Sequence, residues 1–133
     1  KRIINFLQTF ERSGIKVVIK QERLSHLRAM DDKGHTMEVV FILFSSNLPK
    51  DKVIKNFEAR ADLYRAVPGL VQKYYVHDDA TGHFGGIHIF DSLQTAEAFM
   101  NSDLVKSIGN AQNSQEPPTI RLLHIDLVLH KGL

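Results

Sequence analysis

Residues 70–90 read LVQKYYVHDDATGHFGGIHIF, and this stretch decides the fold class. Leu70–His77 and His83–Phe90 are rich in aromatic and β-branched residues, the composition of β-strands. Asp78–Gly82 lies between them and consists mainly of turn-forming residues. The pattern therefore predicts a β-hairpin.

A helix is predicted on either side of this hairpin. Upstream, the capping cluster Ser45–Pro49 and the terminator Pro68-Gly69 enclose four apolar residues at helical spacing, namely Val53, Phe57, Ala61 and Tyr64. Downstream, Asp91 is expected to cap a second helix whose apolar face comprises Leu93, Ala96, Phe99 and Met100.

Two further strands complete the domain. Met37–Phe44 is an apolar run typical of a strand covered on both faces, and Ile120–His130 is the expected last strand. The order strand, helix, strand, strand, helix, strand predicts a ferredoxin-like βαββαβ domain of the α+β class. Its sheet is antiparallel and four-stranded, with both helices on one side.

The first 36 residues fall outside this unit. Ile3, Phe6, Leu7 and Phe10 form a helical stripe over residues 2–12, and Ile15–Ile19 is a β-branched run. We expect residues 1–36 to be an N-terminal extension, a helix followed by a strand, and residues 37–133 to form the ferredoxin-like domain.

Composition narrows the classes of function. The 133-residue chain has no cysteine, which excludes disulfides, thiolate metal sites, iron–sulfur clusters and a cysteine nucleophile. Residues 37–133 carry nine Lys and Arg against eleven Asp and Glu, and this net charge of −2 argues against a nucleic-acid groove. No apolar run approaches the ~20 residues of a membrane span. With no targeting signal visible, we expect a cytoplasmic protein without a membrane partner.

Strand parity separates two kinds of sheet face, because alternate residues of a strand point in opposite directions. One face of each of two strands is wholly aliphatic, and we expect the helices to pack against these faces. They consist of Leu123, Ile125, Leu127 and Leu129 in the last strand and of Ile87 and Ile89 in the strand of residues 83–90. The other faces mix aromatic residues with histidine and aspartate, as ligand sites and polar sheet-to-sheet interfaces both do. Their members are Phe84, His88, Phe90, His124 and Asp126.

Two histidines of the mixed faces are the candidate catalytic residues. An ordinary pKa near 6.5 lets His88 act as a general base near neutral pH; a core histidine satisfied by a neighbour is the alternative. His124 could work with Asp126, two residues away on the same face, as an oriented acid–base pair. A structural cross-strand pair is the alternative for these two residues.

The candidate substrate-binding residues are Phe57, Tyr74, Phe84 and Phe90, together with Asp126. Tyr74 and Tyr75 are adjacent and face opposite ways, so only one can reach a pocket. For each aromatic residue, a place in the core is the alternative. No metal site is predicted, because His83 and His88 point to opposite faces and His77 and His83 lack a third ligand.

Three segments resemble a known family: VPGLVQKYY at 67–75, GGIHIF at 85–90, and the alanine-bearing helix with Ala96 and Ala98. Over Met37–His130 the chain is similar to the YdhR-like mono-oxygenases of the dimeric α+β barrel superfamily, which also contains antibiotic-biosynthesis-type mono-oxygenases. The resemblance implies a homodimer whose sheets pack into a barrel, with a pocket between sheet and helices in each subunit. It also implies cofactor-independent oxygenation of a small aromatic or polyketide-like molecule.

Two other functions stay open on the sequence. The same pocket could belong to a non-catalytic dimeric protein that binds a small hydrophobic or aromatic ligand. Alternatively, the chain could be an oligomerisation or interaction domain in which residues 1–36 are the working arm. Whether the protein is an enzyme is therefore not decided by its sequence.

Overall fold

The computed structural model describes residues 7–12, 15–20, 28–30 and 36–130. Residues 38–124 form four strands and four helices. In chain order these are β4 (Glu38–Phe44), α1 (Lys50–Arg65), β5 (Leu70–Asp78), β6 (His83–Phe90), α2 (Leu93–Met100), α3 (Asp103–Lys106), α4 (Ile108–Ala111) and β7 (Thr119–His124). This order confirms the predicted βαββαβ arrangement, with the second helix divided into three short ones.

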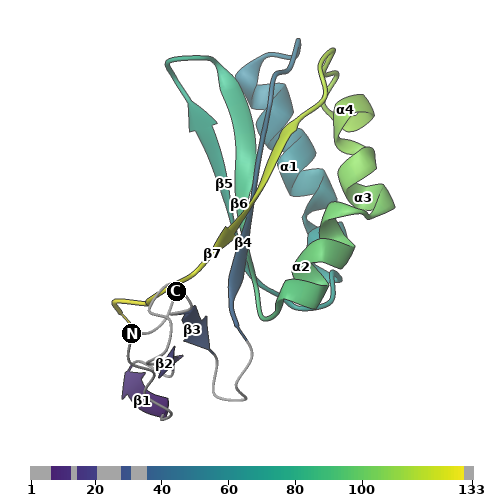
Figure 1. Cartoon of the computed structure of the whole chain (residues 1–133). Coiled ribbons are helices and arrows are strands. Elements are labelled where there is room, and N and C mark those ends of the chain that lie inside the picture. Colours follow the sequence, from purple (N-terminus) through teal and green to yellow (C-terminus); the bar gives the residue numbers. More distant parts are fainter. Residues whose placement is uncertain (1–6, 13–14, 21–27, 31–35, 131–133) are drawn as a thin grey trace.

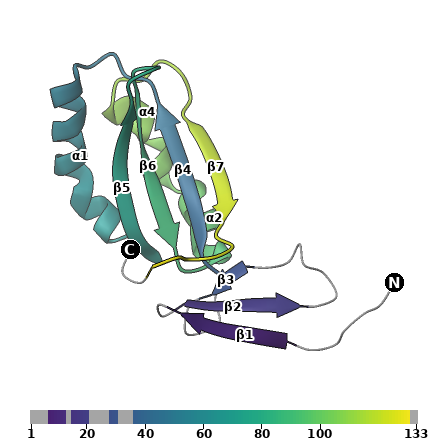
Figure 2. The same cartoon turned by 90° about the vertical axis from the view of Figure 1, so that its left-hand side faces the viewer.

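The four strands form one antiparallel sheet in the order β5-β6-β4-β7. The helices lie on one side of it (Figure 1), and the view turned by 90° looks onto the side without helices (Figure 2). The α+β, ferredoxin-like class predicted from sequence is therefore confirmed.

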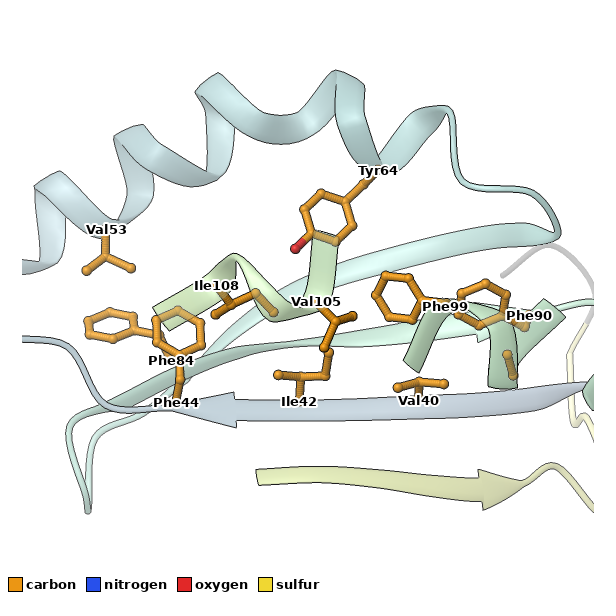
Figure 3. Packing of buried hydrophobic residues seen from close by; sticks show 11 residues of the cluster. Val40, Ile42, Phe44, Val53, Tyr64, Phe84, Phe90, Phe99, Val105 and Ile108 are labelled. Carbon is orange, nitrogen blue, oxygen red and sulfur yellow. The ribbon is translucent and has the colours of Figure 1, made fainter. Parts of the chain in front are cut away.

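The hydrophobic core lies between this sheet and its helices. Alternate residues of β4 are buried, and these point toward the helices together with two phenylalanines of β6 (Figure 3). Val53 and Tyr64 of α1 and Phe99 of α2 pack onto them from above. The cluster on the strands consists of Val40, Ile42, Phe44, Phe84 and Phe90.

The prediction of which face the helices cover is wrong. The covered face is the mixed one, where Phe84, His88 and Phe90 are buried. The aliphatic side is the open one, and Leu123 on it is 45% exposed. Long aromatic side chains suit the deep space beneath helices, whereas short aliphatic ones leave a flat surface, and parity alone cannot distinguish these two situations.

A β-bulge between Leu70 and Gln72 determines which residues of β5 point toward the helices. Without it, Leu70 and Tyr74 would share a face. The extra residue Val71 shifts the alternation, so that Lys73 pairs with His88 and Tyr75 pairs with Gly86 on the helix-covered side.

The last strand is shorter than predicted. β7 ends at His124, which pairs with Glu38, the first residue of β4. One more hydrogen bond follows, from the Ile125 backbone N–H to the Met37 carbonyl oxygen at 3.2 Å. Beyond that point β4 offers no residues for pairing, so the predicted strand does not extend to His130.

The first described segments form a separate antiparallel sheet of β1 (Leu7–Arg12), β2 (Ile15–Lys20) and β3 (Arg28–Met30). The predicted helix is therefore wrong over Leu7–Arg12, and its residues 2–6 lie outside the described part. Isolated helices of about 11 residues are marginal, and pairing with the β-branched β2 satisfies the same backbone groups. The predicted strand at Ile15–Ile19 is confirmed as β2.

The N-terminus of α2 is capped by a serine side chain. Ser92, and not Asp91, is the N-cap of α2, and its hydroxyl accepts a hydrogen bond from the Thr95 N–H at 3.1 Å. Asp91 still contributes, because its carboxylate accepts a bond from the Thr95 hydroxyl at 3.0 Å.

Candidate functional site

His88 is the centre of the candidate site. It lies on β6, is only 2% exposed, and its Nδ1 is 2.8 Å from the Val40 carbonyl oxygen. Because a carbonyl oxygen can only accept, Nδ1 carries the proton and donates it. In the neutral ring, Nε2 then has a free lone pair, and among the described residues this buried atom has no hydrogen-bond partner.

A small cavity of about 20 Å³ adjoins His88. It is as large as the space that one buried water molecule needs. Its polar wall comprises Arg60, Tyr64, Lys73 and Gln112, and its apolar wall includes Ile42, Phe44, Phe57 and Ile108. The cavity thus brings a neutral imidazole together with two cationic side chains.

Gly86 makes room for these side chains. A Cβ atom at this position would lie 2.8 Å from Cε1 of His88 and 3.0 Å from Cε of Lys73. Contacts this short are not tolerated without displacement of the ring or the amine. Gly86 therefore leaves the His88 ring and the end of the Lys73 side chain undisturbed.

Burial governs the ionisation of the two basic groups. Desolvation, aided by the charge of Lys73, lowers the pKa of His88 to about 4, so the ring is neutral at physiological pH. Desolvation, aided by the charge of Arg60, lowers the pKa of Lys73 to about 7. Burial also raises the pKa of the Tyr64 phenol. Tyr64 is therefore a neutral hydrogen-bonding group at physiological pH.

A second, larger pocket of about 580 Å³ lies between α1 and the β5-β6 hairpin. Phe57, Tyr75 and Phe84 form its aromatic wall, and Lys50, Glu58, Arg65 and His77 add polar groups to the lining. Phe57 lines both spaces, and its ring lies 4.6 Å from that of Tyr75, centre to centre. Phe57 therefore borders both the large pocket and the His88 cavity.

The structure brings some of the predicted aromatic residues to these spaces and not others. Phe57 and Phe84 line the large pocket. Phe90 is fully buried in the core and lines neither space. Tyr74 lies on the open face, 42% exposed, and Tyr75 takes the pocket position because of the bulge in β5.

His124 and Asp126 lie away from this site. The Nδ1 atom of His124 contacts the buried carboxylate of Glu38 at 2.6 Å, so Glu38 and not Asp126 is the partner of this ring. Asp126 is exposed and follows the end of β7. Neither His124 nor Asp126 lines either of the two spaces. The structural alternative for His124 is the one that the geometry favours.

Lys73 and Arg60 are site residues that the sequence reasoning missed. Arg60 carried a signal, because it lies three residues after Phe57 and four before Tyr64, on the inner face of α1. Its guanidinium Nη2 donates to the Ser107 hydroxyl at 2.7 Å, which holds it at the cavity. No comparable signal exists in the sequence for Lys73, because the side of the sheet on which it lies depends on the β-bulge at Val71.

Neither metal ligation nor a membrane span is indicated in the described residues. No group of three His, Asp or Glu side chains there could hold a metal ion together. None of the described helices is both long and apolar enough to cross a bilayer.

Residues 39–115 match the family model described as "Putative mono-oxygenase ydhR". No curated protein matches the chain. Among solved structures, a protein of unknown function from Nitrosomonas europaea is 16% identical, with a TM-score of 0.56, and the match covers 73% of this chain and 96% of that one.

Two further structures share the fold. A "putative antibiotic biosynthesis monooxygenase" from Caulobacter crescentus is 18% identical, with a TM-score of 0.53, and the match covers 71% of this chain and 92% of that one. A hydroxynitrile lyase from Passiflora edulis is 13% identical, with a TM-score of 0.52, over 71% of this chain and 97% of that one. At such identities the likeness concerns the fold alone.

Proposed function

We propose that this chain, which belongs to the YdhR mono-oxygenase family, oxidises a small aromatic or polyketide-like molecule with dioxygen and without a cofactor. The observation that carries the proposal is the unpartnered Nε2 of His88, which is buried beside a cavity and next to a larger aromatic pocket. A buried lone pair without a partner is costly for a fold, and such atoms concentrate where function requires them.

The substrate's own bonds supply the electrons in this reaction. A CH₂ group beside a carbonyl or phenol becomes C=O, one oxygen atom of O₂ enters the product, and the other leaves as water. His88 accepts the proton at Nε2, and the resulting carbanion, delocalised as an enolate or phenolate, is the species that reacts with oxygen. Arg60 is the permanent positive charge at the cavity and stabilises the oxyanion.

The lowered pKa of His88 restricts the substrate. A base with a pKa of about 4 is always available at neutral pH, but it is weak. It suits a substrate whose C–H or O–H group is already acidified by conjugation, as in anthrones and quinols. The proposed substrate class therefore agrees with the electrostatics of the base.

In this proposal the substrate approaches His88 from the large pocket and displaces Phe57, which borders both spaces. The large pocket has the volume for one small aromatic ligand, whereas the His88 cavity holds only a molecule of about the size of water or dioxygen. The substrate would bind in the large pocket and reach Nε2 when the Phe57 ring turns aside. The same separation favours ligand binding without turnover as the second candidate function.

A homodimer is the proposed assembly. The open face of the sheet carries apolar side chains from β4, β5, β6 and β7, with Tyr74 and Leu123 both more than 40% exposed. Beside them lie the polar residues Gln72, Thr119 and Arg121. An exposed apolar face of this extent favours a protein partner, and family resemblance favours a second copy of the chain. Residues 1–36 are proposed to be an extension to this assembly.

Oxygen consumption tests the proposed function. An oxygen electrode would follow wild type, His88→Ala and His124→Ala on a panel of anthrones and quinols. We expect uptake with at least one compound, about a hundredfold or greater loss for His88→Ala, and little change for His124→Ala. Equal rates of oxygen uptake for wild type and His88→Ala would show that His88 is not the catalytic base. Binding of panel compounds without any uptake would favour the second candidate.

A further inference from the structure

Lys73 has an unusual environment for a lysine. It lies on β5 beneath α1, with its Nζ atom 3.1 Å from the ring centre of Tyr64 and 4.2 Å from that of Tyr75. Within the described part of the chain, no carboxylate forms an ion pair with it. Lys73 is partly buried, and its amine contacts two aromatic rings and not a carboxylate.

The amine stands between two spaces. Lys73 lines the His88 cavity and also an open pocket of about 290 Å³ on the outer side of β5. The residues that share this third pocket include Ala61, Tyr64, Leu70, Val71 and Tyr75. A ligand carrying a reactive group could thus approach Lys73 from outside while His88 stands on the inner side.

We propose that Lys73 is a nucleophilic amine that forms a reversible imine with an aldehyde or ketone on a small aromatic ligand. The amine nitrogen attacks the carbonyl carbon to give a carbinolamine, and loss of water then leaves a C=N bond. The net change is one water released for one imine formed, without an oxidant or reductant. Nε2 of His88, in the same cavity, is placed to accept and return the proton in these steps.

Two kinds of contact act on the protonation of Lys73: burial and Arg60 favour the neutral amine, whereas the rings of Tyr64 and Tyr75 favour the ammonium. Burial and the positive charge of Arg60 lower the pKa of Lys73 to about 7, so about half of the amine is neutral at pH 7. The titratable and charged groups that face it are Arg60, Tyr64 and Arg65 from α1, Tyr75 from β5 and His88 from β6. None of these is a carboxylate that would restore the charged form.

This activity goes beyond the proposed oxygenation and is tested separately from it. Wild-type protein would be incubated with benzaldehyde and cyanoborohydride at pH 7, which converts an imine into a stable secondary amine, and the modified lysines would be mapped by peptide mass spectrometry. Lys55, exposed on α1, is the internal control. We expect Lys73 to be modified about tenfold faster than Lys55. A rate equal to or below that of Lys55 would overturn the proposal.

The pH dependence is the second readout. Because about half of Lys73 is already neutral at pH 7, the ratio of its labelling to that of Lys55 should be large at pH 7 and shrink toward pH 10. A ratio that stays constant with pH would contradict the inference. In Lys73→Arg, which keeps a positive charge but lacks the amine, the modified peptide should disappear while Lys55 labelling stays the same.

The two proposals fail in different ways. Labelling of Lys73 in a protein that consumes no oxygen would contradict the proposed oxygenase function and support the imine site. Oxygen uptake without preferential labelling of Lys73 would do the reverse.

Discussion

The two faces of the β5-β6-β4-β7 sheet differ in both size and chemistry of their side chains. The helix-covered face holds large aromatic residues and His88, whereas the open face combines aliphatic residues with Phe41 and Tyr74 and with the polar residues Gln72, Thr119 and Arg121. The polar groups of the candidate site are thus gathered where water is excluded, and the apolar surface is left uncovered. In this sheet the face with the aromatic residues and His88 makes the core, and the face rich in aliphatic residues is the one that the helices leave uncovered.

The largest contrast between the faces is expected in stability. Phe90 is fully buried, so Phe90→Ala should lower the free energy of unfolding by about 3–5 kcal/mol through lost burial and a new cavity. Leu123→Ala on the open face should cost less than about 1 kcal/mol in dilute protein. Urea denaturation followed by circular dichroism measures both values. Similar costs for the two variants would contradict the assignment of the faces.

Charge on the open face should act on assembly and not on folding. Leu123 is 45% exposed in the single chain, so Leu123→Lys should leave the fold intact. In a dimer packed through this face the buried ammonium would raise the dissociation constant by about a hundredfold. Sedimentation velocity across a concentration series measures this constant, with Leu63→Lys on the exposed side of α1 as the matched control. A wild-type protein that sediments as a monomer at micromolar concentration would disprove the dimer.

Lys73 on the covered face should destabilise the protein at and below neutral pH. Its folded-state pKa is lowered from 10.5 to about 7, so the unfolded chain binds this proton more tightly than the folded protein. The cost is fully present below pH 7 and fades as the pH rises from about 7 toward 10.5. Lys73→Met should therefore be more stable than wild type by roughly 1–2 kcal/mol at pH 6.

The difference between Lys73→Met and wild type should shrink by pH 9. Thermal unfolding at both pH values, with Lys55→Met as a surface control, measures the effect. A stabilisation that is the same at pH 6 and pH 9 would mean that the ammonium is not desolvated in the fold.

The smallest expected contrast concerns two neighbouring tyrosines. Tyr75 lines the large pocket and Tyr74 lies on the open face, so Tyr75→Ala should weaken binding of an aromatic ligand about fivefold. Tyr74→Ala should change the affinity by less than about twofold. Isothermal titration with an anthrone or quinol gives both constants. Weaker binding by Tyr74→Ala than by Tyr75→Ala would place the ligand on the opposite face.

The order of elements in the domain could be predicted because each strongly patterned segment folds as its own pattern dictates. Residues 70–90 contain two strand-like runs and a turn cluster, and they form β5, its hairpin turn and β6. Segments with weak patterns were less predictable. Over Leu7–Arg12 a short helical stripe was outweighed by pairing with β2, and past His124 an aliphatic run had no strand to pair with.

The candidate site was only partly predictable, for two physical reasons. His88 is visible in the sequence as a polar residue within an apolar strand, and Phe57 as an aromatic residue at the regular apolar spacing of its helix. Which strand face the helices cover depends on how side-chain volumes fit together, and this is a property of the packed structure. The place of Lys73 depends on a single unpaired residue, Val71, which has no mark in the local sequence.

The bulge in β5 also affects how relatives of this chain must be compared. Because Val71 is the unpaired residue, a relative that lacks it can keep the same pocket lining. A relative that instead lacks one residue between Lys73 and the hairpin could pair regularly with β6, and Gln72 and Tyr74 would then replace Lys73 and Tyr75 beneath α1. The position of a one-residue gap in an alignment therefore decides which side chains are equivalent, and in this strand it carries more information about the pocket than percentage identity does.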